Sequence, residues 1–179
     1  SIKKGLMKKN EVMQTYSPSM DIQISSNFER LLFELYGRDG KITQTMMKTF
    51  SKTGSFEVGK SQLEQALYLF AAQRFTDDET LAIMTQVLNE NKEILDPHSA
   101  IGVAAGRAKR INKNTPHISL ATAHPAKFPD AVKLACGEHP SLPQRLSDLF
   151  VRKENFTVLE NDRGQVQDFI NNHRMDGAF

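Results

Sequence analysis

The sequence predicts an α/β protein that is rich in helices and holds only part of a parallel sheet. Residues 118–121 and 156–159 are short apolar runs typical of strands, and residues 12–16 are a third candidate. A helical pattern follows each run, which indicates parallel pairing through crossover connections. Parallel sheets are buried on both faces, and two or three short strands cannot build one. We therefore expect the 179 residues to be an incomplete portion of a larger domain.

Three helices are predicted in the first half of the chain by capping-box signatures. In each signature a Ser or Thr is followed three residues later by Glu, and an apolar stripe at helical spacing comes next. The signatures start at Ser26, Ser61 and Thr76. Only a weak helical pattern lies between the first two, and we interpret residues 38–95 as a mostly helical excursion from the core. The expected buried stripes are Phe28, Leu31, Leu32 and Leu35, then Leu63, Ala66, Leu67 and Phe70, then Leu81, Met84 and Leu88.

Proline and glycine mark the elements of the second half. Asp96-Pro97 places an N-cap residue before a proline at the first helical position, and the helix that follows, 99–109, carries mainly small residues. Small side chains predict close packing against a neighbouring element. A short helix is expected from Pro129 to Gly137, then a helical stretch at 144–150 and a final helix around 166–170.

Composition limits the classes of function. Basic and acidic residues number 23 and 21, a balance that favours neither nucleic acid nor an acidic membrane as a partner. We interpret a small cluster of lysines near the start as solvated surface. The single cysteine, Cys136, excludes an internal disulfide and fits the reducing cytoplasm. No apolar run approaches the ~18 residues that a membrane span needs.

Motifs for several chemistries are missing from the sequence. There is no glycine-rich phosphate loop and no nucleophile elbow. The five histidines lack the spacing of a metal site, so no metal is predicted.

Two polar turns are candidate binding sites. Thr122 and His124 follow the predicted strand 118–121, and α/β proteins bind ligands where such strands end. The alternative is a loop shaped by prolines. Asp96 and His98 lie at a helix N-terminus, which can bind an anion, and the alternative there is simple capping.

Four segments, in their order and spacing, resemble the carboxyl-terminal part of threonine synthases. The family consists of enzymes that use pyridoxal 5'-phosphate (PLP) and adopt the tryptophan synthase β-like fold. They convert O-phospho-L-homoserine and water into L-threonine and phosphate. The resemblance implies that an amino-terminal portion of the same protein is absent from these 179 residues. The segments are Ser17-Pro18-Ser19-Met20-Asp21-Ile22, Ser26-Asn27-Phe28-Glu29-Arg30, Asp96-Pro97-His98-Ser99-Ala100 and Thr122-Ala123-His124-Pro125-Ala126-Lys127-Phe128.

The resemblance also implies roles for individual residues. Thr122 is expected to place its hydroxyl on the pyridine nitrogen of PLP, and Asp96, His98 and His124 are expected to support the site without touching the cofactor. The family's S-F-K-D and G-N-F-G motifs, which carry the Schiff-base lysine and the phosphate loop, do not occur in the chain. Lys127 is not that lysine. We thus expect no catalytic residue here and no activity from the isolated chain.

The alternative function is a non-catalytic homologue, or an interaction module that retains half of the fold. A helical nucleic-acid binder is disfavoured, because no aromatic residues are interspersed with the basic cluster to form a stacking surface.

Overall fold

The computed structural model describes residues 3–174 and divides into two compact units, Ser1–Ser141 and Leu142–Phe179. The first unit contains β1 (Leu6–Lys8), η1 (Pro18–Met20), α1 (Ser26–Leu35), α2 (Gly40–Thr53), β2 (Ser55–Glu57), α3 (Lys60–Leu69), α4 (Asp77–Asn91), α5 (Pro97–Lys109), η2 (Pro125–Lys127) and α6 (Pro129–Cys136). The second contains the 3-10 turns η3 (Gln144–Leu146) and η4 (Leu149–Val151), followed by α7 (Arg163–His173).

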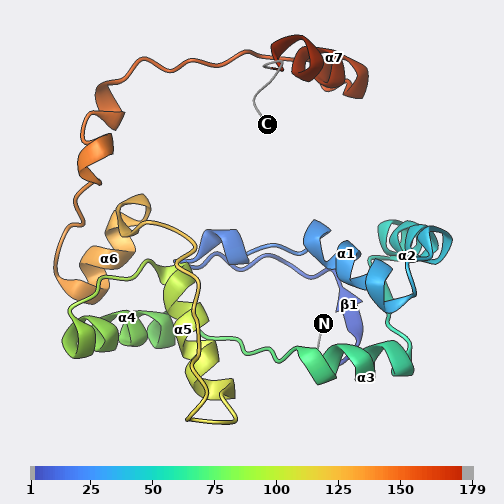
Figure 1. Ribbon diagram of the computed structural model, residues 1–179, viewed down its shortest axis with the longest axis horizontal. Helices are drawn as coiled ribbons and strands as arrows, with labels where there is room; N and C mark the ends of the chain where they lie inside the picture. Colours follow the sequence, from blue (N-terminus) through green and yellow to red (C-terminus); the bar gives the residue numbers. More distant parts are fainter. Residues whose placement is uncertain (1–2, 175–179) are drawn as a thin grey trace. The chain divides into compact units, whose positions relative to one another are not determined.

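The first of two hydrophobic clusters joins α1 and α2 to a small sheet (Figure 1). Its buried members are Leu32 of α1, Phe50 of α2 and Phe56 of β2, and the two phenylalanine rings meet edge to face with centroids 5.5 Å apart. β1 and β2 pair antiparallel, with Met7 opposite Phe56. Gly54, in the left-handed conformation at φ 72°, ends α2 and turns the chain into β2, so a side chain would be strained at that position.

The second cluster joins α4, α5 and α6, with α4 packing on both of the other helices (Figure 1). Met84, Ala100 and Val132 are its fully buried members. The predicted small face of α5 is confirmed as a packing surface, because Ala100, Ala104 and Gly106 are all buried. Small side chains here let neighbouring backbone approach closely. The Thr85 hydroxyl of α4 also donates to the Ala135 carbonyl of α6 at 2.7 Å.

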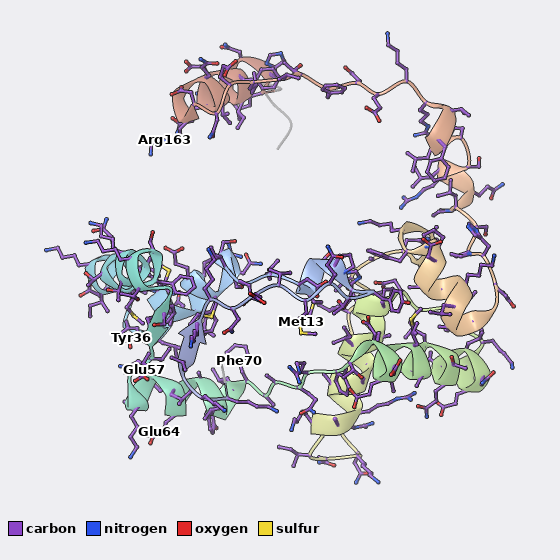
Figure 2. All side chains as sticks on the ribbon, turned by 180° about the vertical axis from the view of Figure 1, so that it is seen from behind. Met13, Tyr36, Glu57, Glu64, Phe70 and Arg163 are labelled. Carbon is purple, nitrogen blue, oxygen red and sulfur yellow. The ribbon has the colours of Figure 1, made fainter. Side chains whose placement is uncertain are left out.

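The predicted strands 12–16, 118–121 and 156–159 are not strands in the described part of the chain. These segments are non-helical, and the sheet found among residues 3–174 is the antiparallel β1–β2 pair instead. A strand exists only when a neighbouring strand accepts and donates its backbone hydrogen bonds. Their apolar side chains face solvent: Met13 is 80% exposed (Figure 2), Ile118 82% and Val158 82%. The strand prediction for these three segments is therefore wrong for the described chain.

Helix existence was predicted better than helix ends. The Thr76 capping box is confirmed, with the Glu79 carboxylate accepting from the Thr76 N–H at 2.7 Å. The other two boxes are wrong: Ser25 precedes α1, Gly59 precedes α3, and neither helix has a side-chain cap. Residues 144–150 form 3-10 turns rather than an α-helix. The final helix is confirmed as α7.

Two further properties concern the described residues as a whole. No helix between residues 3 and 174 has the length and apolar character needed to cross a membrane. Residues 38–95 contain the whole of α2, β2, α3 and α4, and their interpretation as an excursion from a catalytic core stays a prediction.

Cys136, at the end of α6, should be a slow nucleophile. Partial burial and, secondly, the Glu138 carboxylate raise the pKa of its thiol above the ordinary value. A raised pKa leaves less thiolate at any given pH, and the thiolate is the reactive form. We expect the pH midpoint of alkylation by iodoacetamide to lie higher in the folded chain than in the chain unfolded in urea. Glu138→Gln should lower the folded midpoint part of the way, and equal midpoints in all three samples would contradict the assignment.

Candidate functional site

Asp96 forms the centre of a buried hydrogen-bond network at the start of α5. As the N-cap residue, it accepts from the backbone N–H of His98 at 2.9 Å and of Ser99 at 3.3 Å. It also accepts from the side chains of the same two residues, at Nδ1 of His98 and Oγ of Ser99. Asp96 is 1% exposed, so these four donors replace the water that a carboxylate would otherwise bind.

His98 connects this network to the turn at η1. Its Nε2 accepts from the Ser19 backbone N–H at 3.2 Å, and its Nδ1 lies 2.9 Å from the Asp96 carboxylate. A ring nitrogen that accepts carries no proton, so the proton is on Nδ1 and is donated to Asp96. The ring also packs on Phe128, with centroids 4.5 Å apart. His98 therefore holds together three segments that are distant in sequence.

Ser99 connects the same network to Thr122. Its hydroxyl donates to Asp96 and accepts from the Thr122 backbone N–H at 3.1 Å. Thr122 is an exposed residue, and its hydroxyl makes no hydrogen bond within the part of the chain described. The main chain of Thr122 is thus anchored while its hydroxyl is available to a ligand.

The segment leading to Thr122 runs along α5 where that helix has its smallest residues. A Cβ at Gly106 would lie 2.0 Å from Nε2 of His117, so only glycine allows this approach with the His117 ring in place. A cavity of about 370 Å³ lies between the two segments, lined by residues that include Gly102, Ser119 and Leu120.

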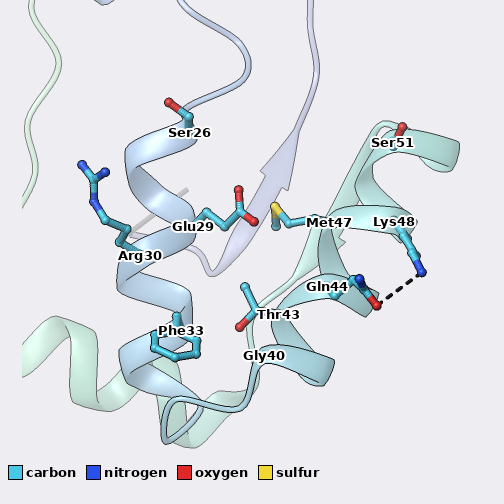
Figure 3. Close-up of a pocket in the computed structure, with 10 residues that line it drawn as sticks. All are labelled: Ser26, Glu29, Arg30, Phe33, Gly40, Thr43, Gln44, Met47, Lys48 and Ser51. Atoms are coloured by element: carbon cyan, nitrogen blue, oxygen red, sulfur yellow. Dashed lines mark hydrogen bonds between the residues drawn. The ribbon is translucent and has the colours of Figure 1, made fainter. Parts of the chain in front are cut away.

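A larger cavity, of about 650 Å³, lies between α1 and α2 (Figure 3). Figure 3 shows Glu29 directed toward Met47, and Lys48 bonded to Gln44 of its own helix at 3.3 Å. None of the residues predicted for the site lines this cavity. Within residues 3–174, no group of three or more His, Cys, Asp or Glu side chains could hold a metal ion.

The structure brings together some of the predicted site residues. Asp96 and His98 are bonded to each other, and Thr122 joins them through Ser99. The His124 side chain lies outside this network, where its Nδ1 accepts from the Ala126 N–H and caps η2. Sequence reasoning did not assign a role to Ser99. Ser99 could have been recognised from its position three residues after the N-cap Asp96, since a side chain there can reach the cap residue.

Comparison with known proteins adds to this geometry. Residues 99–170 match the family described as "Threonine synthase, C-terminal". The chain is 43% identical over 166 residues to a threonine synthase of Pseudomonas aeruginosa, which covers 92% of the chain and 35% of that protein. Its fold superposes with a TM-score of 0.80 on a crystal structure of PLP-bound threonine synthase from Brucella melitensis, at 49% identity, covering 96% of the chain and 37% of that structure. For threonine synthase from yeast the TM-score is 0.75 at 36% identity, covering 95% of the chain and 38% of that structure.

The fold and the matching structures define the class of protein. The chain is a helix-rich, incomplete part of the α/β domain found in those synthases. The chain spans about a third of the length of the curated relatives it matches. It belongs to the threonine synthase family and corresponds to the carboxyl-terminal portion of its members.

Proposed function

We propose that this chain supplies the pyridine-nitrogen contact of a PLP-dependent threonine synthase, the complete protein converting O-phospho-L-homoserine and water into L-threonine and phosphate. The observation that carries the proposal is the anchored Thr122 with its free hydroxyl, in a chain 49% identical to the matching part of a PLP-bound threonine synthase. The partner of the chain is the remaining portion of the same protein, and the compartment is the cytoplasm, in keeping with one unpaired Cys136.

Residues of the chain fit one edge of a pyridine ring. Thr122 is exposed, its hydroxyl makes no hydrogen bond to the described residues, and a hydroxyl can donate to a ring nitrogen without adding charge. An uncharged donor differs from a carboxylate, which would hold the ring nitrogen protonated. The carboxylate nearest in the network, Asp96, is fully occupied by its four donors, so it does not compete for that nitrogen.

The supporting residues orient this hydroxyl. Asp96 and His98 fix the start of α5 and, through Ser99, the main chain of Thr122. His124 caps η2 and so sets the direction in which the chain leaves the site. In the proposal these residues position Thr122 and do not touch the cofactor.

The covalent chemistry is assigned to the rest of the protein. When bound, PLP supplies an electron sink for carbanions formed on the substrate. Lys127 is not the lysine that binds the cofactor in this proposal. It is exposed, and its ammonium lies 5.9 Å from the centroid of the Phe128 ring. The chain on its own should accordingly show no visible absorbance band of protein-bound PLP after gel filtration.

The test is Thr122→Val in a full-length threonine synthase that contains this sequence. Valine keeps the shape of threonine and removes the hydroxyl, so kcat should fall by about tenfold, the value of one hydrogen bond of ~1.4 kcal/mol. The absorbance maximum of bound PLP should shift as well. Thr122→Ser, which keeps a hydroxyl, should restore both.

Lys127→Ala serves as the control and should leave the PLP band in place. Loss of the band in that variant would show that Lys127 binds the cofactor, and unchanged kinetics and absorbance in Thr122→Val would remove Thr122 from the site.

A further inference from the structure

The backbone around Thr122 has one anchor. Among the described residues between 117 and 124, only the Thr122 N–H donates a hydrogen bond, and its acceptor is Oγ of Ser99 at 3.1 Å. The neighbouring Ile118 and Leu120 side chains are 82% and 74% exposed, so they bury little area that would fix the segment. Ser99 is therefore the one hydrogen-bond partner, among the described residues, that holds the Thr122 main chain.

The Ser99 hydroxyl is held in one orientation. Ser99 is 3% exposed and lies in the first turn of α5, where its backbone N–H is already bonded to Asp96. Its only hydroxyl proton is donated to the same carboxylate oxygen, Oδ2 of Asp96. A hydroxyl has one donor and two acceptor lone pairs, so Oγ must act as an acceptor toward Thr122. A hydrogen bond to a carboxylate makes that oxygen a better acceptor, because neighbouring bonds polarise each other.

We propose that Ser99 is a positioning residue for the Thr122 site: its hydroxyl, oriented by Asp96, fixes the main chain from which the Thr122 hydroxyl reaches its ligand. The effect of Ser99 on the cofactor site rests on the proposed function, whereas the Ser99–Thr122 contact does not depend on it. The network then runs from the η1 turn through His98, Asp96 and Ser99 to Thr122. Ser99 touches neither substrate nor cofactor.

The hydrogen bond between the Ser99 hydroxyl and the Thr122 N–H is tested by amide hydrogen exchange in the chain itself. Ser99→Ala removes the only acceptor of the Thr122 N–H, so exchange at Thr122 should accelerate by about tenfold. Ser99→Thr retains a hydroxyl on the same atom and should restore the slow rate. Ser119→Ala is the matched control: Ser119 lies in the same segment, makes no hydrogen bond within the described residues, and should leave the Thr122 rate unchanged.

The result that overturns the contact is an unchanged Thr122 rate in Ser99→Ala. Equal acceleration at Thr122 and throughout α4 and α5 would also overturn it, because Ser99 would then act only on helix stability. Exchange at Thr122 responds to Ser99 whether or not Thr122 touches PLP. Failure here is therefore distinguishable from failure of Thr122→Val, which tests the cofactor contact.

The positioning role of Ser99 toward the cofactor site is tested in a full-length threonine synthase that contains this sequence. Ser99→Ala should lower kcat by about tenfold and shift the absorbance maximum of bound PLP in the same direction as Thr122→Val, while KM for O-phospho-L-homoserine stays within about twofold. Ser99→Thr should restore both readings. A Ser99→Ala enzyme with normal absorbance and normal kcat would overturn the positioning role.

Discussion

Asp96→Ala should destabilise the α4–α5–α6 cluster by about 3 kcal/mol, the sum of a lost N-cap and of buried donors left without an acceptor. The substitution leaves the N–H groups of His98 and Ser99, the Nδ1–H of His98 and the Ser99 hydroxyl unpaired in a site that water does not reach. The measurement is amide exchange in α4 and α5, where a loss of 3 kcal/mol corresponds to rates on the order of 100-fold faster.

Asp39→Ala is the matched control for this prediction. Asp39 is also an aspartate N-cap, and it accepts from the N–H groups of Lys41 and Ile42 at the start of α2. It is exposed, however, so water can replace the carboxylate, and the loss should be about 1 kcal/mol. Equal losses for Asp39→Ala and Asp96→Ala would mean that the buried network adds nothing beyond ordinary capping.

Leu32→Ala should destabilise the other cluster by about 3 kcal/mol, within the range for truncating a fully buried leucine. Leu32 is 0% exposed and packs with Phe50 and Phe56, so its loss leaves a cavity between α1, α2 and β2. Amides of α2 should exchange on the order of 100-fold faster, as measured by mass spectrometry. Amides of α5 should change little, because the two clusters share no buried residue.

Leu69→Ala provides the comparison. Leu69 is 73% exposed at the end of α3, so little apolar area is lost and the effect should stay within about 0.5 kcal/mol. If Leu32→Ala accelerated exchange equally in α2 and α5, the two clusters would be one cooperative unit, and the independence expected here would be wrong.

Local signals in the sequence predicted the helices because each helix satisfies its own backbone. The apolar stripe of α1, the Asp96-Pro97 start of α5 and the Thr76 capping box are all readable without knowledge of the fold. The strands could not be predicted in this way. Residues 118–121 have the composition of a strand, yet pairing depends on a neighbour that no local pattern specifies. The β1–β2 pair was missed for the same reason, since its strands are only three residues long and far apart in sequence.

For the site, the sequence pointed to candidate residues but not to the contacts between them. Asp96, His98 and Thr122 were predicted as a group from the family resemblance, and the assigned roles stay predictions. That Ser99 connects Asp96 to Thr122 is a contact across 23 residues, which depends on how α5 meets an extended segment. The Ser19–His98 bond spans 79 residues and is equally invisible in a local pattern.

The exposed extended segments have a consequence for how the protein assembles. Ile118 and Leu120 are 82% and 74% exposed, and neither makes a backbone hydrogen bond within the described part of the chain, so the segment offers an apolar edge that another strand can pair with. Two events compete for such an edge. Pairing with strands of the same polypeptide is independent of concentration, whereas pairing between separate copies becomes faster as concentration rises. Dilution during refolding should therefore favour the correct sheet, and crowding of the isolated chain should favour aggregates rich in intermolecular strands.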